Sequence, residues 1–403
     1  MPPASTRAPA IAVAVCFCIA ALEGYDIQAF GVAAPAMAPA LGLAKDQVGF
    51  AGSAAMLGLI VGAVFGGWLA DRIGRKPVLV ASTAWFGVFS LVTTLATGAE
   101  TLTLFRLLTG LGFGGAMPNM VAMAVEISRP ERRISTVSAM FVGFPAGGAL
   151  VSLLTPFLTD WRAIFAVGGL LPLAVTPLAL LLLPESRPIA DTTARPDRRA
   201  LAALFGGGRA LTTLLLWLAS ILTLLIIYLL VNWLPTLVVG QGHSKAAGAL
   251  AALSFNVVGV AGGLIAGRVA DRFDFRWPLA AAYVGLAAAT VGLALSRQVA
   301  SMFIFSGLAG AFVLGAQYVL YALPPRYYAA AVRGAGAGAA VAAGRVGSIA
   351  GPAIAGLVLS AGASGGDVMR LLTPVALAAG AAAFGLSFVG RAIDEPEPGV
   401  ARV

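Results

Sequence analysis

Two carboxylates stand close together in an apolar stretch near the start of the chain. Residues 19–30 read IAALEGYDIQAF, in which Glu23 and Asp26 are the only charged residues. Since they are three positions apart, they would share one face of a helix. An acid inside a membrane costs about 2.5–3.5 kcal/mol on insertion scales, so such acids usually face a cavity and carry function. We expect this pair to handle coupling protons, because close carboxylates in a low dielectric favour protonation of one another. A structural pair bonded to backbone or to Arg106 is the alternative.

Two arginines are also expected inside apolar segments. Arg345 would lie near the middle of the segment 335–360, where its planar guanidinium can bind a carboxylate through two hydrogen bonds. We therefore expect it to bind a substrate carboxylate, and the alternative is an internal salt bridge with Asp26 or Glu23. Arg106 is assigned to the substrate site too, with proton transfer or pairing with Glu23 as its other possible roles.

The segments that must position these residues are apolar along almost the whole chain. Hydrophobic residues make up 59% of the 403 residues and charged residues only 11%, whereas a soluble protein carries about 25% charged residues. Apolar runs of about twenty residues, enough to span a bilayer as a helix, follow one another. A transmembrane β-barrel would instead show alternating segments of about ten residues.

The sequence therefore predicts an all-α membrane protein with twelve transmembrane helices. The first is too long to be a cleaved signal peptide. The predicted spans are 11–36, 47–70, 77–97, 101–125, 134–157, 162–184, 211–238, 246–268, 277–295, 300–323, 335–360 and 368–390.

Basic residues gather on one side of the predicted spans. With the N-terminus inside, most of the 26 Lys and Arg residues fall in segments on the cytoplasmic side. This asymmetry follows the positive-inside rule and predicts that both termini are cytoplasmic. The net charge of +9 is explained by this topology, and no nucleic-acid partner is needed to account for it.

The chain repeats itself at a distance of 200 residues. GWLADRIGRK at 67–76 aligns with GRVADRFDFR at 267–276, and LFRLLTGLGFGG at 104–115 aligns with IFSGLAGAFVLG at 304–315. A repeat that holds one shift over separate places indicates duplicated architecture. Arg345 falls on Pro145 in this alignment, so it does not belong to the shared scaffold and is expected to belong to a site.

The repeat divides the chain into two halves of six spans each. We expect an N-terminal half at 1–184, a cytoplasmic linker at 185–210 and a C-terminal half at 211–403. An even number of spans per half makes the halves parallel, related by an axis along the membrane normal. This arrangement suits a transporter with alternating access to a central site, and favours it over a scaffold or sensor.

Several motifs resemble those of the major facilitator superfamily. GWLADRIGRK resembles its loop 2–3 signature, RLLTGLGFGG from Arg106 its fourth-span motif, and LPESRP at 183–188 the end of its sixth span. LEGYDIQAFGVAAPAM, MPNMVAMAVE and GRVGSIAGP resemble segments of its aromatic acid:proton symporters. LVNWLPTLV and YVLYALPPRYY are similar to the branch that carries 3-(3-hydroxyphenyl)propionate. The resemblance implies the major facilitator fold, and its D/E-G-x-D motif falls on Glu23, Gly24 and Asp26.

The resemblance also implies which side chains meet the substrate. In that superfamily, spans one, four, seven and ten line the central cavity. Aromatic rings there can stack on a substrate ring at about 4.5–7 Å between centroids, while Asn232 and Gln317 can bond a phenol hydroxyl. Interfacial-belt or core packing is the alternative for this set. The residues expected to bind substrate beside the two arginines are Tyr228, Asn232, Gln317, Tyr318 and Tyr321.

A set of charges near the repeated GWLADRIGRK motif is expected to latch the halves together in the outward-open state. The set comprises Asp71, Arg72, Arg75, Glu126, Asp271 and Arg272. The sequence places the first three, with Lys76, in a cytoplasmic loop, and Glu126 is expected to pair with Arg75. Setting the topology is the alternative role of these charges.

The pattern as a whole predicts proton-coupled uptake of a small aromatic carboxylate, such as 3-(3-hydroxyphenyl)propionate or a hydroxybenzoate. We expect a monomer in the bacterial inner membrane, surrounded by lipid, with protons as coupling ion, no other cofactor and no enzyme activity. Two cysteines and one histidine offer no metal-ligand spacing. The alternatives are an importer of non-aromatic organic anions and a drug:proton antiporter, whose Gly-Pro-x-x-Gly-Gly pattern is broken in GFPAGG at 143–148.

Overall fold

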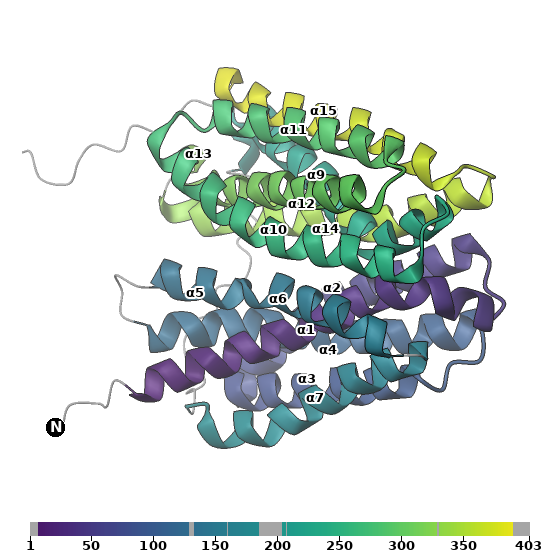
Figure 1. The fold of residues 1–403 in the computed structure, drawn as a ribbon. Helices are drawn as coiled ribbons and strands as arrows, with labels where there is room; N and C mark the ends of the chain where they lie inside the picture. The colour runs from purple at the N-terminus through teal and green to yellow at the C-terminus, as the bar shows by residue number, and fades with distance from the viewer. Residues whose placement is uncertain are drawn as a thin grey trace, which may run out of the picture.

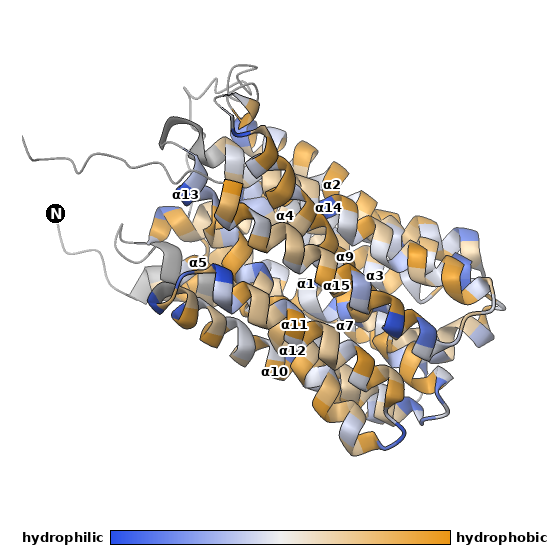
Figure 2. Ribbon diagram, turned by 90° about the horizontal axis from the view of Figure 1, so that it is seen from above, coloured by the Kyte–Doolittle hydropathy of each residue, from blue (hydrophilic) through white to orange (hydrophobic). Residues whose placement is uncertain are grey.

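A computed structural model describes residues 7–128, 133–158, 160–184, 204–206, 208–328 and 330–389. The described residues form helices and short connections, with no strand among them. Twelve of the helical segments are long and apolar enough to cross a membrane, as the sequence predicted. Hydrophobic residues cover most of the helices, while hydrophilic residues gather toward the ends of the bundle (Figure 2).

The spans form two six-helix halves that lie one above the other in Figure 1. The helices of the first half are α1 (Arg7–Ala40), α2 (Lys45–Ile73), α3 (Arg75–Thr93), α4 (Ala99–Ile127), the pair α5 (Arg133–Phe141) and α6 (Gly143–Leu154), and α7 (Trp161–Leu182). Those of the second half are α9 (Ala210–Gly240), α10 (Lys245–Arg272), α11 (Arg276–Leu295), α12 (Val299–Ala322), α14 (Ala330–Ser360) and α15 (Gly365–Val389). A short helix, α13 (Pro324–Tyr327), precedes α14.

The internal repeat is visible in where the helices begin. Lys45 and Lys245 start α2 and α10, while Ala99 and Val299 start α4 and α12, each pair 200 residues apart. The turns before α2 and α10 both contain a glycine with positive φ, Gly42 and Gly242. Most of the predicted linker at 185–210 lies outside the described residues.

Two local expectations need correction. The fifth span is interrupted at Val142, because Pro145 has no N–H for the Phe141 carbonyl and its ring crowds that carbonyl. Asp71, Arg72 and Arg75 lie in helix ends and not in a loop, since Gly74 alone separates α2 from α3. That tight connection uses φ of +94°, which glycine adopts without strain.

Helix α1 is held against α6 by direct backbone contact. A Cβ at Gly24 would lie 2.1 Å from the Phe144 carbonyl oxygen, and one at Gly147 would lie 1.7 Å from the Ala21 carbonyl oxygen. Small residues permit such close approach of membrane helices. Because Gly24 stands between Glu23 and Asp26, this contact determines which way α1 turns and therefore where each carboxylate points.

The two halves are bonded to each other at one end of the bundle. We call this end, which carries residues 41–44 and 241–244, the distal end, and the end where α1 begins the proximal end. The Asp46 backbone N–H donates to Ser360 Oγ at 2.9 Å, which donates to Asp46 Oδ1 at 3.1 Å. Lys45 Nζ donates to the Leu359 carbonyl at 3.4 Å. The N-terminus of α2 is thereby fastened to the C-terminus of α14.

A second bond between the halves lies deeper in the bundle, on α1. Gln28 Nε2 donates to the Val231 carbonyl on α9 at 2.9 Å, and Gln28 Oε1 accepts from Asn256 Nδ2 on α10 at 3.0 Å. Ser53 on α2 also donates to the Ile349 carbonyl on α14 at 2.6 Å. The halves are therefore joined by polar contacts from the distal end down to the level of Gln28.

We predict that Gly24→Ala lowers the thermal unfolding midpoint of the purified protein in detergent. The added methyl group overlaps the Phe144 carbonyl, and overpacking of this kind costs about 1–3 kcal/mol. Gly67→Ala is the matched control, because a Cβ at Gly67 of α2 meets nothing within 4 Å. Equal midpoints for the two variants would contradict the role given to the α1–α6 contact.

Candidate functional site

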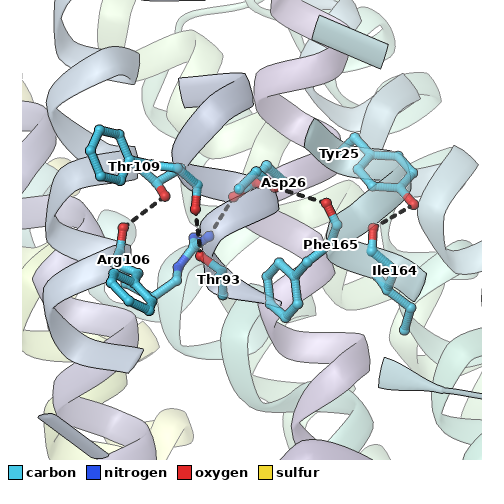
Figure 3. Close-up of polar contacts among 10 residues, drawn as sticks. Tyr25, Asp26, Thr93, Arg106, Thr109, Ile164 and Phe165 are labelled. Carbon is cyan, nitrogen blue, oxygen red and sulfur yellow. Dashed lines mark hydrogen bonds and ion pairs between the residues drawn. The ribbon is translucent and has the colours of Figure 1, made fainter. Parts of the chain in front are cut away.

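Asp26 and Arg106 form an ion pair inside the first half. The guanidinium of Arg106 on α4 bonds Asp26 Oδ1, and Ser90 on α3 donates to Asp26 Oδ2. The two charged residues are 0% and 1% exposed. Figure 3 shows Asp26 facing Arg106 across the helices, with Phe165 beside it. Asp26 and Arg106 thus neutralise one another in a region from which solvent is excluded.

The surroundings of this ion pair hold it in place. Ser90 Oγ also lies 3.2 Å from the Phe165 carbonyl, so its single proton has two neighbouring acceptors. The Tyr25 hydroxyl donates to the Ile164 carbonyl at 3.1 Å, which ties α1 to α7 (Figure 3). The Arg106 guanidinium lies 5.4 Å from the ring centroid of Phe30 and 5.8 Å from that of Phe165. Those distances are within cation–π range.

Glu23 has a different environment from Asp26, although only one helical turn separates them. Its side chain is 0% exposed, and neither carboxyl oxygen has a hydrogen-bond partner among the residues that the structure describes. The charged groups that act on it are Arg345 and Asp26. An unpaired charge in such a place is costly, so an orphaned buried carboxyl group is a candidate for a functional role.

Arg345 on α14 is a buried cation with no carboxylate at contact distance. It is 8% exposed. Nη1 donates to the Tyr228 hydroxyl on α9 at 3.0 Å and Nη2 to the sulfur of Met117 on α4 at 3.2 Å. Within the described residues no carboxylate oxygen comes within 4.0 Å of its guanidinium, so the internal salt bridge considered from the sequence is not formed here. Arg345 therefore bridges the two halves and has donors to offer an anion.

The other predicted substrate-binding residues lie around this centre in different ways. Tyr321 on α12 is 43% exposed and lies near the charge of Arg345. Gln317 is 3% exposed, and both polar atoms of its amide lack a hydrogen-bond partner. The ring of Tyr318 packs against Gly263 of α10. Asn232 donates to the Tyr228 carbonyl of its own helix at 2.8 Å, and its Oδ1 faces Gly52 of α2.

The predicted gating residues lie at the proximal ends of their helices. The predicted pairing of Arg75 with Glu126 is present as an ion pair within the first half. Asp71 and Arg72 are exposed in the last turn of α2, where the Arg72 guanidinium lies 3.9 Å from the Trp68 ring centroid. Arg272 is exposed in the last turn of α10, and the side chain of Asp271 lies outside the described set.

Four residues of the site were missed from the sequence. Ser90 and Met117 touch the charged groups directly, and Gln28 and Asn256 join the halves. Gln28 could have been predicted from the sequence, because the repeat aligns it with Tyr228 and it lies in the same apolar stretch as both acids. A serine, a methionine or an asparagine in a small-residue helix carries no such signal.

We predict that Asp26→Asn lowers the unfolding midpoint and that Asp26→Asn/Arg106→Gln restores part of the loss. Removing one partner of a buried ion pair costs about 3–5 kcal/mol because the other charge is left uncompensated, whereas replacing both is often neutral. The measurement is thermal unfolding of purified variants in detergent.

Glu126→Gln is the matched control for this prediction. Arg75 and Glu126 are 22% and 39% exposed, and partly exposed ion pairs contribute only about 0–1 kcal/mol. A double variant that is no more stable than Asp26→Asn would show that the pair does not stabilise the first half through mutual neutralisation.

Comparison with known proteins agrees with this architecture. Residues 16–352 match the Major Facilitator Superfamily model. The solved xylose–proton symporter superposes with a TM-score of 0.73 at 20% identity, covering 95% of this chain and 97% of that one. A bacterial homologue of the human lysosomal transporter Spinster gives a TM-score of 0.75 at 16% identity, covering 96% and 98% of the two chains.

Curated relatives are similar along almost their whole length. The 3-(3-hydroxy-phenyl)propionate transporter of Escherichia coli K12 is 40% identical, covering 94% of this chain and 96% of the relative. The gallate transporter of Pseudomonas putida is 34% identical over 96% and 93% of the two chains. The 4-hydroxybenzoate transporter PcaK of Pseudomonas aeruginosa is 35% identical over 92% and 90%. The chain is a multi-pass membrane protein and not an enzyme, and it belongs to the aromatic acid transporter family of the major facilitator superfamily.

Proposed function

We propose that the protein takes up a small aromatic carboxylate, such as 3-(3-hydroxyphenyl)propionate or a hydroxybenzoate, together with a proton, by alternating access. The observation that carries this proposal is the central arrangement of Arg345 and Glu23. In the part of the chain that the structure describes, no carboxylate lies within 4.0 Å of the buried Arg345 cation, and the buried Glu23 acid has no hydrogen-bond partner. The relatives, which transport aromatic acids, support the substrate class.

Arg345 is the group that receives the substrate carboxylate in this proposal. A guanidinium offers parallel N–H donors that match both oxygens of a carboxylate. Its present partners are a tyrosine hydroxyl and a thioether, both neutral, so an arriving anion replaces weak acceptors with a charged one. Contacts from α14 to α9 and α4 mean that the substrate would be held by both halves, as alternating access requires.

Glu23 is the group that carries the proton. When ionised, it would compete with the substrate for Arg345, because its negative charge attracts the guanidinium. When protonated, it leaves Arg345 free for the substrate anion. One proton moving with one monovalent anion is electroneutral, so the pH gradient and not the membrane voltage would drive uptake.

Asp26 receives a different role, although both acids were assigned to proton handling from the sequence. Its carboxylate already bonds Arg106 and Ser90, so we propose that it stabilises the first half and fixes α1 beside Glu23. Arg106 would then act on the substrate only indirectly. We assign the two acids different roles because Asp26 is bonded to Arg106 and Ser90, whereas Glu23 has no hydrogen-bond partner among the described residues.

Alternating access would require the distal contacts to open and proximal contacts to form. In this structure the halves are joined distally through Asp46 and Ser360, while Arg75 on the proximal side forms an ion pair with Glu126 of its own half. We propose that Asp71, Arg72, Asp271 and Arg272 engage in the opposite state. The proximal side would be cytoplasmic, in the inner membrane, and the unit a monomer.

We predict that proteoliposomes containing the protein accumulate radiolabelled 3-(3-hydroxyphenyl)propionate when the outside is made more acidic. Without a pH gradient, uptake should stop at equilibration, and benzoates and cinnamates should compete. No accumulation under either gradient polarity would contradict the symport proposal and favour a non-aromatic anion as substrate. Efflux of organic cations in exchange for protons would instead favour the antiporter alternative.

We predict that Arg345→Gln lowers the affinity for the acid and that Arg345→Lys restores it only in part. Losing one partner of a buried charge pair costs about 2–5 kcal/mol, roughly 30-fold or more in affinity. Lysine keeps the charge but lacks the planar fork. Arg268→Gln is the control, because that exposed guanidinium donates only to the Leu264 carbonyl of its own helix. Unchanged uptake in Arg345→Gln would exclude a role for this residue in binding.

A further inference from the structure

The amide of Gln317 is the one buried amide of the described residues that has neither polar atom in a hydrogen bond. It is 3% exposed on α12, with Nε2 and Oε1 both unpartnered. The other buried amides are bonded: Gln28 to Val231, Asn119 to Gly115, Asn232 to Tyr228, and Asn256 to Gln28 and Ala252. A buried polar group left without a partner in a native structure calls for an explanation, and a ligand is one.

The internal repeat indicates where this amide points. A shift of 200 residues places Gln317 on Met117 of α4, whose sulfur accepts a hydrogen bond from Arg345. Two parallel halves related by an axis along the membrane normal place equivalent residues at the same depth, on opposite sides of that axis. Gln317 therefore corresponds, in the second half, to a side chain that touches the central cation.

Contacts within the second half agree with this position. Tyr321 lies one helical turn beyond Gln317, on the same face of α12. Its hydroxyl interacts with the Gln317 amide, although not in the geometry of a normal hydrogen bond, and with the charge of Arg345. The amide of Gln317 and the guanidinium of Arg345 thus share Tyr321 as a neighbour.

We propose that Gln317 selects the substrate by hydrogen bonding to a hydroxyl group on its aromatic ring, which makes it a specificity-determining residue. This inference rests on the function proposed above. A neutral amide supplies one donor and one acceptor function, and a phenolic hydroxyl supplies the matching acceptor and donor. With the carboxylate on Arg345, a ring hydroxyl would satisfy the amide, and an unsubstituted ring would leave both its atoms unpaired. Sites built to bond a substrate hydroxyl reject analogues that lack it.

The test compares two acids that differ by one hydroxyl, 3-(3-hydroxyphenyl)propionate and 3-phenylpropionate, in proteoliposomes under an inward proton gradient. We expect the wild type to prefer the hydroxylated acid by about tenfold or more in uptake efficiency. Gln317→Met, which keeps the length of the side chain but removes its polar atoms, should abolish the preference while retaining uptake of 3-phenylpropionate. A loss of packing alone would lower both uptakes and leave their ratio unchanged.

The outcomes separate this inference from the proposed function. If the wild type and Gln317→Met take up both acids with the same ratio, Gln317 does not select the hydroxyl and the symport proposal stands. If the wild type takes up neither acid, both proposals fall. If Gln317→Met loses all uptake, the test uses Gln317→Glu instead. This variant keeps the size of the side chain and a hydrogen-bond acceptor. A preference for the hydroxylated acid in that variant supports the inference, and equal uptake of the two acids overturns it.

Discussion

A guanidinium buried between two helical bundles, with no carboxylate of the described residues within 4.0 Å, is the feature on which the rest of this structure depends. Arg345 is 8% exposed and donates only to a hydroxyl and a sulfur. A charge in low dielectric is costly unless it is paired, so the binding of an anion beside Arg345 is energetically favoured. Glu23, fully buried and without a hydrogen-bond partner among the described residues, is the internal carboxylate that we propose pairs with Arg345 when no substrate is bound. Competition between an internal carboxylate and a substrate carboxylate for one cation is a simple physical basis for coupling.

The remaining elements fix the positions of Glu23 and Arg345 relative to one another. Backbone contact at Gly24 and Gly147 sets the rotation of α1, and the pairing of Asp26 with Arg106 removes the second acid from competition for Arg345. Gln28 bonds α1 to α9 and α10 of the other half. Helix α1 is therefore fixed just beyond Glu23, to its own half through Asp26 and to the other half through Gln28.

The fold could be predicted almost entirely from the sequence, because the thickness of the bilayer sets the length of each span and the repeat indicates duplicated architecture. Local features of the structure were predicted less well from the sequence. Pro145 could have predicted the break at Val142, and Gly74 could have predicted that Asp71 and Arg72 lie in a helix. Apolar runs alone predict neither feature. Spacing placed Glu23 and Asp26 on one face, yet it could not tell which acid meets Arg106, since that depends on how α4 packs beside α1. Ser90 and Met117 became visible only when packing brought them to the charged groups.

Substrate affinity as a function of pH, in the wild type and in Glu23→Gln, tests the central claim most directly. The measurement is the Kd of the purified protein for an aromatic acid between pH 6 and 9, a range in which the ligand stays ionised. If the protonated form of Glu23 frees Arg345, wild-type affinity should fall by about tenfold per pH unit once Glu23 ionises, as one linked proton requires. The affinity of Glu23→Gln should stay flat. A flat wild-type profile, or the same slope in both proteins, would contradict the account.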